Sequence, residues 1–426
     1  MNTKIKTIRG MNDILPEATR LWRYVEEIVR DVVESYGYRE IRVPLIEYTD
    51  LFKRSIGEVS DIVEKEMYTF KDRNDGSLTL RPEATASLVR AGLTNGLLHN
   101  QKQKLWTSGP MFRYEKPQQG RYRQFSQFDV EAMGYFGPDV DVELIIMCSN
   151  MWKRLGISQL TLEINSLGSN ESRSIYRQEL IKYFEKIKQK LDQDSIRRLE
   201  KNPLRILDSK NPEMHEIIEK APKMLDYLDP DSAQHFSLFK DMLDQSGIKY
   251  VVNPRLVRGL DYYNRTVFEW VTDALGAQGA VCSGGRYDTL VEKLGGRSTP
   301  AIGWAMGMER LISLYEKCGG KHHPNNTDVF IVAVGEDVFQ KSLELSERLR
   351  DSFQNLRVEV NLGGGGFKSQ LKRADKSGAS YAIIIGENEL QEGTYGLKPL
   401  RSNENQVTIS SEKIIEELEK KIENNK

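Results

Sequence analysis

The sequence predicts a sheet-containing domain that is interrupted by a helical unit and followed by a small α/β domain. Residues 105–113 and 125–133 alternate as strands on either side of a basic loop, which is typical of an antiparallel hairpin. From residue 169 to 247 the composition turns to Lys, Glu, Gln and Asp, with apolar residues at helical spacing. Beyond residue 328, strand and helix patterns alternate, which indicates an α/β domain with a largely parallel sheet. A chain of 426 residues has room for two or three domains.

A helix followed by a strand is predicted near the start of the chain. Apolar residues from Leu21 to Tyr36 follow a 3,4 spacing that predicts a helix, and Gly37 is placed to end it. Residues 38–43 then alternate as a strand that Pro44 stops. This helix and strand suit the surface of a partner molecule and the packing of their own domain equally well.

Further strands are predicted on both sides of the helical unit. Residues 78–85 run from a strand into a helix, and Pro82 and Glu83 suit the first helical turn. The later patterns lie at residues 249–252, 266–270, 276–288 and 301–311, the last of which runs from strand into helix. We therefore predict one domain formed by residues 1–168 and 248–318, with residues 169–247 as a helical insertion.

The C-terminal domain is predicted at residues 328–426, after a polar linker at residues 319–327. Its expected strands and helices are strands at 328–334, 357–360 and 381–385 and helices at 339–353 and 368–377. A closing helix is expected beyond residue 411, because Ile414, Leu418 and Ile422 recur every four residues.

The composition argues against several classes of protein. The net charge of -1 gives no overall attraction to nucleic acid, so any polyanion site must be a local patch. The three cysteines form no CxxC and the five histidines no HxxxH, which argues against a disulfide framework and against a zinc site. No apolar run approaches the ~20 residues that span a bilayer, and no secretory signal is seen. We expect no metal site, no membrane contact and a reducing, cytoplasmic location.

Residues 256–269 are the most informative stretch of the chain. Two arginines, Arg258 and Arg265, stand beside the paired Tyr262 and Tyr263 between two predicted strands. Arginines at a strand edge beside tyrosines suit a phosphate held next to a flat, hydrogen-bonding ligand. Taken alone, the stretch also fits a turn with a surface salt bridge, because charged residues at turns are usually solvated.

Three arginines in separate segments favour the phosphate interpretation. Arg113, Arg258 and Arg310 are predicted at strand ends or helix starts. Phosphoryl chemistry needs cations that are already in place on oxygens that gain or share charge, and a guanidinium donates two parallel hydrogen bonds. Each arginine also has a neighbouring acid with which it could form an ordinary salt bridge: Glu115, Asp261 or Glu309.

The glycines Gly284, Gly285, Gly303 and Gly307 allow the backbone to come close to a ligand. Close packing of a strand on a helix is the alternative for all four, and it fits Gly307 better than Gly284. Residues 363–369 superficially resemble a phosphate-binding loop, but a phenylalanine stands where that loop requires a glycine before its lysine. We interpret this run as a flexible loop ahead of a basic helix.

With these segments in order, the chain resembles the class II aminoacyl-tRNA synthetases, and among them the bacterial histidyl-tRNA synthetases, nearly end to end. The segments similar to the three class II motifs are residues 36–44 (motif 1), 109–113 with 121–125 (motif 2) and 303–310 (motif 3). Residues 256–269 and 284–288 resemble the two histidine-specific signatures, of which the first is long and highly specific. The resemblance implies an α+β catalytic domain, in which helices flank an antiparallel sheet, and a C-terminal α/β anticodon-binding domain.

The same resemblance implies an ATP-dependent histidine–tRNA ligase and gives roles to its residues. Arg113 and Arg258 are the implied catalytic residues, on two sides of the α-phosphate of ATP, and Arg310 holds the γ-phosphate. Arg258 does work that other class II enzymes give to a metal ion. The implied histidine pocket contains Arg113 and Arg258 together with Glu83, Ala84, Thr85, Gln127, Glu131, Tyr262 and Tyr263.

The implied imidazole partners, Glu131 and Tyr263, agree with the chemistry of the ligand. An imidazole presents one donor and one acceptor nitrogen, so an acid plus a phenol can read both. A site that hydrogen-bonds its substrate rejects analogues that leave its polar groups unpaired. Two positions depart from the pattern of many bacterial members: Ala84 replaces a glycine and Ser126 a histidine. Neither change removes a group with an implied role.

The resemblance further implies a set of partners. ATP with Mg²⁺ and L-histidine are the implied small substrates, with no zinc and no organic cofactor, and motif 1 implies a homodimer. Histidine tRNA is the implied macromolecular partner, with its anticodon at residues 328–426. Its acceptor end is expected at the basic loop that contains Lys116, Gln118, Arg121 and Arg123.

Two other interpretations compete with a ligase. A regulatory subunit of ATP phosphoribosyltransferase shares this catalytic fold and binds histidine without charging tRNA, but such relatives typically lack the C-terminal domain and have eroded motifs. A pure RNA-binding module leaves Arg113, Arg258 and Arg310 unexplained. Fold alone does not decide between these functions.

Overall fold

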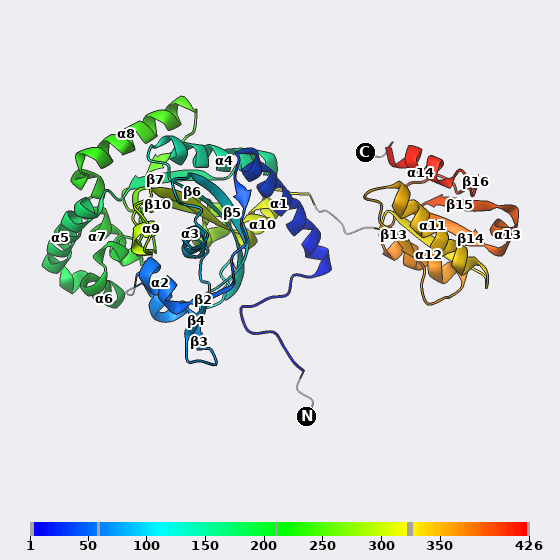
Figure 1. The fold of residues 1–426 in the computed structure, drawn as a ribbon, viewed down its shortest axis with the longest axis horizontal. Helices are drawn as coiled ribbons and strands as arrows, with labels where there is room; N and C mark the ends of the chain where they lie inside the picture. Colours follow the sequence, from blue (N-terminus) through cyan, green and yellow to red (C-terminus); the bar gives the residue numbers. More distant parts are fainter. Residues whose placement is uncertain (1–3, 58–59, 119, 210, 322–326, 424–426) are drawn as a thin grey trace. The chain divides into compact units, whose positions relative to one another are not determined.

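The computed structural model describes residues 4–57, 60–118, 120–209, 211–321 and 327–423 (Figure 1). Its internal contacts separate a larger unit, residues 1–14 with 22–321, from a smaller unit, residues 322–426 with 15–21. None of the helices in these described ranges is long and apolar enough to cross a membrane.

The larger unit is built on an eight-stranded sheet. Its strands are β1 (Arg39–Glu40), β5 (Gln103–Phe112), β6 (Gln124–Met133), β7 (Thr161–Ser166), β8 (Val251–Val252), β9 (Asn264–Val271), β10 (Ala280–Arg286) and β11 (Ala301–Gly307). They lie in the order β1-β5-β6-β11-β10-β9-β7-β8. The central strands pair antiparallel, whereas the edge strands β1 and β8 run parallel to β5 and β7. The predicted hairpin is therefore confirmed as β5–β6, and the sheet is mixed only at its edges.

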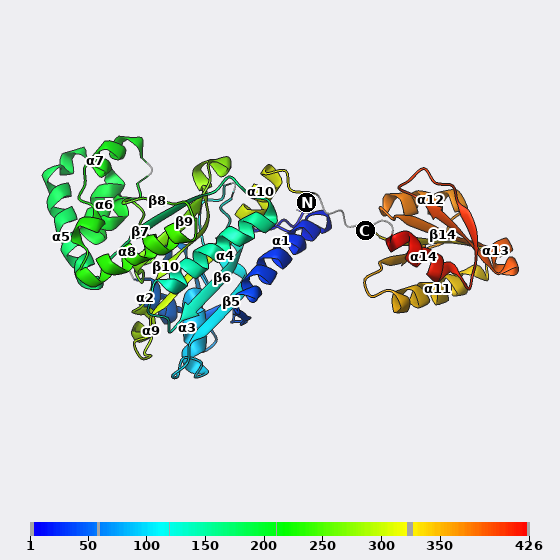
Figure 2. The same cartoon turned by 90° about the horizontal axis from the view of Figure 1, so that it is seen from above.

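Helices cover both faces of this sheet (Figures 1 and 2). On one face, α4 (Asp139–Leu155) contacts β11, and α8 (Pro230–Gln245) contacts both α4 and β9. On the other face, α2 (Thr49–Ile56), α3 (Thr85–Thr94) and α9 (Leu290–Lys293) contact one another. α10 (Met308–Lys317) follows β11 directly and packs on β6. α1 (Pro16–Ser35) begins five residues before its apolar pattern does.

The segment between β7 and β8 was predicted from its composition to be a helical insertion, and it is mainly helical in the structure. It contains α5 (Asn170–Lys186), α6 (Gln193–Lys201), α7 (His215–Glu219), α8 and several short 3₁₀ turns. Side-chain oxygens of Ser169, Asp192 and Asp229 accept hydrogen bonds from the amides that open α5, α6 and α8. Tyr176, Phe184 and other apolar side chains form a core of its own beneath these helices.

A second, three-stranded sheet precedes the hairpin. It has the order β2 (Ile46–Tyr48), β4 (Ser77–Leu80) and β3 (Tyr68–Lys71), all antiparallel. Only the β4 strand was predicted, because the other two are short and follow charged or proline-containing stretches.

The smaller unit holds a five-stranded sheet. The strands are β12 (Val329–Val334), β13 (Val358–Val360), β14 (Tyr381–Gly386), β15 (Thr394–Pro399) and β16 (Val407–Ser410), in the order β13-β12-β14-β15-β16. The helices are α11 (Val338–Ser352), α12 (Phe367–Lys376), α13 (Glu387–Glu392) and α14 (Ile414–Glu423). The three predicted strands run parallel, as expected. β15 and β16 add an antiparallel half that the sequence analysis missed.

Candidate active site

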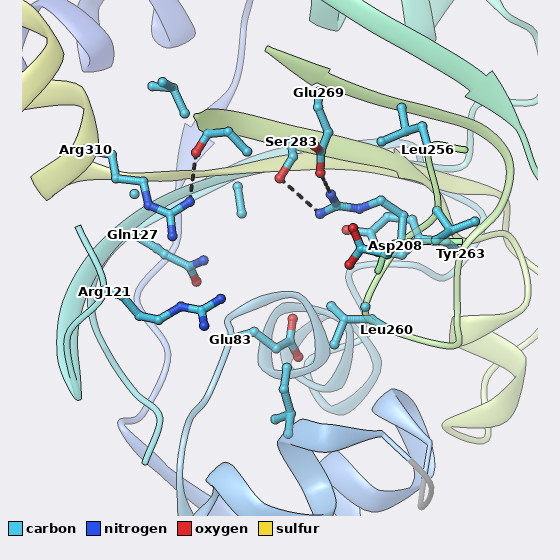
Figure 3. Close-up of a pocket in the computed structure, with 18 of the residues that line it drawn as sticks. Glu83, Arg121, Gln127, Asp208, Leu256, Leu260, Tyr263, Glu269, Ser283 and Arg310 are labelled. Atoms are coloured by element: carbon cyan, nitrogen blue, oxygen red, sulfur yellow. Dashed lines mark hydrogen bonds and ion pairs between the residues drawn. The ribbon is translucent and has the colours of Figure 1, made fainter. Parts of the chain in front are cut away.

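A cleft of about 570 Å³ opens on the sheet face opposite α4 (Figure 3). Its walls come from the start of α3, the β5–β6 hairpin, residues 253–263, the strands β9 to β11 and the start of α10. Figure 3 shows Arg310, Gln127 and Arg121 on one side of the space, facing Glu269 and Tyr263 across it. Nine candidate site residues that the sequence analysis selected line the cleft: Glu83, Thr85, Arg113, Arg121, Gln127, Arg258, Tyr262, Tyr263 and Arg310.

The floor of the cleft follows from strand register. Asp129 on β6, Ala305 on β11, Ser283 on β10 and Glu269 on β9 lie opposite one another in one row across four strands. Because side chains alternate between the faces of a strand, all four point to the same face. The small side chains in the middle leave room for a ligand, and the acids stand at both ends of the row.

Gly303 on β11 leaves space for the carboxylate of Glu131. Gly303 is the register partner of Glu131, and a Cβ at Gly303 would collide with the Glu131 carboxylate and the Val130 carbonyl. A side chain larger than hydrogen would therefore displace the carboxylate.

The roles expected for Gly284 and Gly307 are exchanged in the structure. A Cβ at Gly284 would collide with the carbonyl of Gly303 and crowd the Phe268 ring, on the face away from the cleft. Gly307 instead lines the cleft, and its nearest side chain is Arg310. Close packing thus explains Gly284, and ligand access explains Gly307, because the two positions point to opposite faces of the sheet.

Glu83 closes the start of α3. Its carboxylate accepts hydrogen bonds from the amides of Thr85 at 2.8 Å and Ala86 at 3.0 Å, just before the helix begins at Thr85. Glu83 therefore caps the helix. From the sequence, Glu83 was predicted in the first helical turn, and that prediction is wrong because the helix begins at Thr85. The Tyr262 hydroxyl donates to Glu83 Oε2 at 3.4 Å. Burial raises the pKa of Glu83.

Glu131 lies behind the cleft wall. Its carboxylate accepts one hydrogen bond from the Thr85 hydroxyl and one from the Tyr287 hydroxyl, each 2.6 Å long. Burial, and then the nearby Asp129 and Glu83 charges, raises the pKa of Glu131 to about 8, although the two hydrogen bonds act in the opposite direction. Tyr287 was not selected from the sequence, although it stands inside the second histidine-like signature. Ala84 is fully buried in the core beneath and does not line the cleft.

Gln127 and Asp129 each carry a buried polar atom without a hydrogen-bond partner. Within the residues that the structure describes, these atoms are Gln127 Oε1 and Asp129 Oδ2. Both residues line the cleft. Burial, and then the nearby Glu83 charge, raises the pKa of Asp129 to about 8. Buried polar atoms without partners are rare in proteins, and here they indicate a place for a hydrogen-bond donor of a ligand.

Arg258 is held by an acid and a hydroxyl. It forms an ion pair with Glu269 and donates to Ser283 Oγ at 3.1 Å, and its guanidinium lies 5.2 Å from the centre of the Tyr263 ring. The ion-pair partner of Arg258 is therefore Glu269 on β9. Asp261, the neighbouring acid considered from the sequence, does not form this ion pair.

Arg113 and Arg310 are held by main-chain carbonyls. Arg113 donates from Nε to the Pro82 carbonyl at 2.8 Å, and its guanidinium lies 5.2 Å from the centre of the Phe125 ring. Arg310 donates from Nε to the carbonyl of Gly120 and from Nη1 to the carbonyl of Ala280. Neutral carbonyls help to position both guanidinium groups.

The basic loop between β5 and β6 divides into an inner and an outer part. Arg121 lines the cleft and forms an ion pair of 2.5 Å with Glu115. Arg123 stacks on the Tyr114 ring at 3.8 Å. Lys116 and Gln118 are exposed and lie outside the cleft lining.

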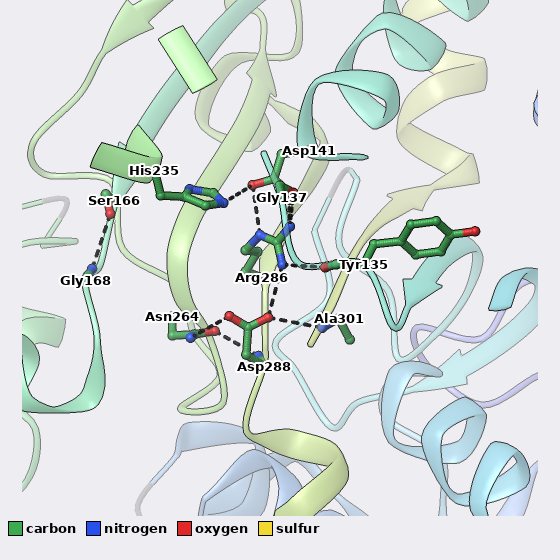
Figure 4. Close-up of polar contacts among 10 residues, drawn as sticks. All are labelled: Tyr135, Gly137, Asp141, Ser166, Gly168, His235, Asn264, Arg286, Asp288 and Ala301. Carbon is green, nitrogen blue, oxygen red and sulfur yellow. Dashed lines mark hydrogen bonds and ion pairs between the residues drawn. The ribbon is translucent and has the colours of Figure 1, made fainter. Parts of the chain in front are cut away.

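A buried ionic cluster supports the strands behind the site (Figure 4). Arg286 forms ion pairs with Asp141 at 2.7 Å and Asp288 at 3.2 Å. Asp288 accepts hydrogen bonds from the Asn264 side chain and the Ala301 amide, each 3.1 Å long. The cluster thus joins β9, β10 and β11 next to Tyr287, with one guanidinium shared between two carboxyl groups.

No group of three or more His, Cys, Asp or Glu side chains is placed to hold a metal ion within the described parts of the chain. Cys148 and Cys282 are buried free cysteines with sulfur atoms 3.9 Å apart.

Comparison with known proteins agrees with this geometry. Residues 10–311 match the sequence family described as Histidyl-tRNA synthetase, and residues 328–421 match the family described as Anticodon binding domain. The structure of apo histidyl-tRNA synthetase from S. aureus is 37% identical, covers 97% of this chain and 99% of that chain, and has a TM-score of 0.81.

Two more distant structures share the fold. One is a histidyl-tRNA synthetase from a Nostoc species, 20% identical over 98% of this chain and 100% of that chain, with a TM-score of 0.71. The other, from Bacillus halodurans, is described as an ATP phosphoribosyltransferase regulatory subunit/histidyl-tRNA synthetase; it is 21% identical over 91% of this chain and 99% of that chain, with a TM-score of 0.65. The family match over residues 10–311 and the S. aureus likeness show that this chain belongs to the histidyl-tRNA synthetases, the ATP-dependent histidine–tRNA ligases.

Proposed function

We propose that both steps of histidine–tRNA ligation take place in the cleft and that its side chains divide the work. The observation that supports this most directly is the convergence of Arg113, Arg258 and Arg310 on one space that is also lined by Glu83 and Gln127. Three cations face the place of a triphosphate, and the polar groups beside them suit an amino acid.

Arg113 and Arg258 act on the α-phosphate from two sides, and Arg310 binds the γ-phosphate of a bent ATP. Arg113 also receives the histidine carboxylate. Each guanidinium is fixed before ATP arrives, by a carbonyl or by an ion pair, so little reorganisation is needed as charge moves onto the phosphate oxygens. Arg258 and Arg113 are the catalytic residues in this proposal.

Glu83, Thr85 and Gln127 surround the α-amino group of histidine, and the buried, unpaired Gln127 oxygen supports this assignment because it can accept a hydrogen bond. Glu131 and Tyr263 bind the imidazole, with Tyr262 beside them. Ala84 contributes backbone only, since its side chain is buried in the core. A pocket of this kind selects histidine because any analogue that lacks a ring nitrogen leaves a buried polar group unpaired.

The reaction then proceeds in two steps. The histidine carboxylate attacks the α-phosphorus in line, a new C–O–P bond forms, and pyrophosphate leaves. A ribose hydroxyl at the tRNA 3′ end then attacks the carbonyl of the acyl-adenylate, and AMP leaves. Positioning and charge stabilisation carry the first step.

Glu269 and Glu309 are carboxylates on the cleft wall that would hold a magnesium ion bound with ATP, and the ion would neutralise charge on the phosphate oxygens. Arg258 supplies the charge on the α-phosphate that a further metal ion would supply elsewhere.

The tRNA meets the chain at two places. The acceptor end lies along the β5–β6 loop, with Lys116 and Gln118 on its exposed part and Arg121 and Arg123 nearer the cleft. The anticodon binds residues 328–426, where the basic residues of α12 are exposed: Lys368, Lys372, Arg373 and Lys376. If deletion of residues 328–426 left tRNA affinity unchanged, the second assignment would fail.

Three broader expectations complete the proposal. The chain forms a homodimer through motif 1, residues 36–44, and works in the cytoplasm. Its catalytic domain comprises residues 1–168 and 248–318, with residues 169–247 inserted and residues 319–327 as a linker. Sedimentation equilibrium tests the dimer, since a monomeric mass at working concentration contradicts it.

The deciding experiment is histidine-dependent exchange of labelled pyrophosphate into ATP, with the other amino acids tested in parallel. Exchange with histidine alone is expected, because only the first step is needed. Histidine binding without any exchange would contradict the proposal and favour a regulatory histidine-binding role.

A further inference from the structure

Side chains of the helical insertion form hydrogen bonds with the segment that carries Arg258 and the paired tyrosines. Arg173 on α5 donates from Nη1 to the Asp261 carbonyl at 3.2 Å and from Nη2 to the Tyr263 carbonyl. Asn202, just after α6, donates to Asp261 Oδ1 at 3.1 Å. Arg205 donates to the Gly259 carbonyl at 2.9 Å. Three side chains of the insertion therefore bond to residues 259–263.

The bonded segment, residues 253–263, has little regular secondary structure. β8 ends at Val252 and β9 begins at Asn264, so residues 253–263 take part in no strand pairing. On the side away from the insertion, the Asp261 amide donates to the Ile56 carbonyl of α2 at 3.1 Å. No strand ladder fixes this main chain, so it is held by the bond to Ile56, by the packing of Leu256, Tyr262 and Tyr263 in the core, and by the insertion side chains that bond to it.

Arg173 makes two of these contacts. Its guanidinium is largely withdrawn from water, and this burial lowers the pKa of Arg173. Two of its bonds go to the main-chain carbonyls on either side of Tyr262 and one to Asn170 Oδ1, while its buried Nε has no partner among the described residues. The bonds to Asp261 and Tyr263 fix the main chain from which both tyrosine side chains reach the cleft.

We propose that Arg173 is a positioning residue for the histidine pocket: from the inserted unit it holds the main chain at Asp261 and Tyr263, and thereby sets the affinity for histidine. The proposal rests on the histidine-binding role of the cleft. It places an element outside the catalytic sheet in control of substrate affinity. Arg205 acts in the same direction on Gly259, next to Arg258.

The test compares Arg173→Ala, Arg173→Lys and Arg205→Ala with Arg177→Ala. Arg177 lies one turn along the same helix, is exposed, and donates only a long bond of 3.5 Å to the Lys201 carbonyl within the described residues. Three quantities are measured on the full chain: the histidine dissociation constant by equilibrium dialysis, the KM values for histidine and ATP in pyrophosphate exchange, and the thermal midpoint.

We expect Arg173→Ala to weaken histidine binding and raise the histidine KM about tenfold or more, with the ATP KM changed less than about twofold. The histidine KM of Arg173→Lys should lie between those of the unsubstituted chain and of Arg173→Ala. An ammonium can replace one of the two carbonyl contacts but cannot donate to both carbonyls as the planar guanidinium does. Arg205→Ala should shift the same constants by less, and Arg177→Ala should match the unsubstituted chain.

Two results overturn the inference. One is histidine affinity in Arg173→Ala equal to that in Arg177→Ala. The other is a lower thermal midpoint with the histidine and ATP constants changed in parallel, which marks Arg173 as a structural brace only. If Arg173→Ala fails to fold, Arg173→Lys and Arg205→Ala decide by the same criteria. Dialysis also separates the two proposals: histidine binding without exchange contradicts the ligase site, while the effect of Arg173 on binding is still measured.

Discussion

Arg310 donates a hydrogen bond of 2.9 Å from Nε to the carbonyl oxygen of Gly120, and this bond joins the start of α10 to the tip of the β5–β6 loop. The arginine proposed for the γ-phosphate is thus bonded to the loop proposed for the tRNA acceptor end. A phosphate oxygen is a stronger acceptor than a neutral carbonyl, so ATP is expected to take the Gly120 position. We therefore predict that ATP binding and the loop conformation are coupled through this side chain.

Arg310→Ala should raise the KM for ATP about tenfold or more, because a hydrogen bond to a charged group contributes roughly 1.5–3 kcal/mol. The histidine dissociation constant should stay unchanged, since Arg310 lies on the phosphate side. Pyrophosphate exchange at varied ATP measures the effect. Lys317→Ala is the matched control: Lys317 ends the same helix, is exposed, and donates to the Ala274 carbonyl at 2.6 Å. Equal ATP constants in the two variants would remove Arg310 from the phosphate site.

Arg258→Ala should slow pyrophosphate exchange about 10²-fold or more, because a charge aimed at the α-phosphate is lost. It should also lower stability, because Glu269 remains part-buried without its cation. The double variant Arg258→Ala/Glu269→Ala separates the two effects: it should recover stability in urea but not the exchange rate. Recovery of exchange in the double variant would show that Arg258 acts only by neutralising Glu269.

Glu131→Gln should raise the histidine KM about tenfold while the ATP KM stays the same. Both carboxylate oxygens accept hydrogen bonds, from Thr85 and Tyr287, and an amide replaces one acceptor with a donor. Tyr287→Phe should have a smaller effect in the same direction, because only one donor is lost. Pyrophosphate exchange at varied histidine measures both variants, and a greater effect of Tyr287→Phe would mean that Tyr287 itself binds the ligand.

The fold was predictable from the sequence wherever one periodic pattern decides an element. The β5–β6 hairpin and the parallel strands β12 and β14 follow from alternation and from continuous apolar runs. β15 was missed because its sequence contains Gly396 and ends at Pro399, both unfavourable in strands. Strand β1 is only two residues long, although residues 38–43 alternate, because pairing with β5 stops early.

The site was predictable only as far as residue types indicate it. The three arginines could be selected because phosphate groups need cations, whereas the histidine-pocket residues, Glu83 among them, were selected only through the resemblance to the synthetase family. Asp129 and Tyr287 were missed, and Gly284 and Gly307 were exchanged, because these depend on which face of the sheet a residue occupies. A shift of register by one residue reverses every face, and register is set by the partner strand. The positioning role proposed for Arg173 could likewise not be predicted from the sequence, because Arg173 lies about 90 residues before the carbonyls to which it donates.

His235 should make the larger unit sensitive to mild acid. It lies on α8 with Nε2 3.6 Å from Asp141 Oδ2, and it is only 7% exposed. Burial, and then the positive charges of Arg286 and Arg265, lowers the pKa of His235 to about 4. An unfolded chain has a histidine pKa of about 6.5. As the pH falls below that value, the unfolded chain takes up a proton that the folded chain refuses, so stability decreases.

The measurement is urea unfolding at pH 7 and pH 5.5, followed by tryptophan fluorescence, because all five tryptophans lie in residues 22–304. Between these pH values the unsubstituted chain should lose about 1 kcal/mol more stability than His235→Gln, which has no proton to gain. His99→Gln is the control, because His99 is exposed, and it should follow the unsubstituted chain. The carboxyl groups of Asp129 and Glu131, whose pKa values are raised to about 8, act in the opposite direction and are present in all three chains. Equal acid losses in His235→Gln and His99→Gln would mean that His235 is protonated in the folded chain.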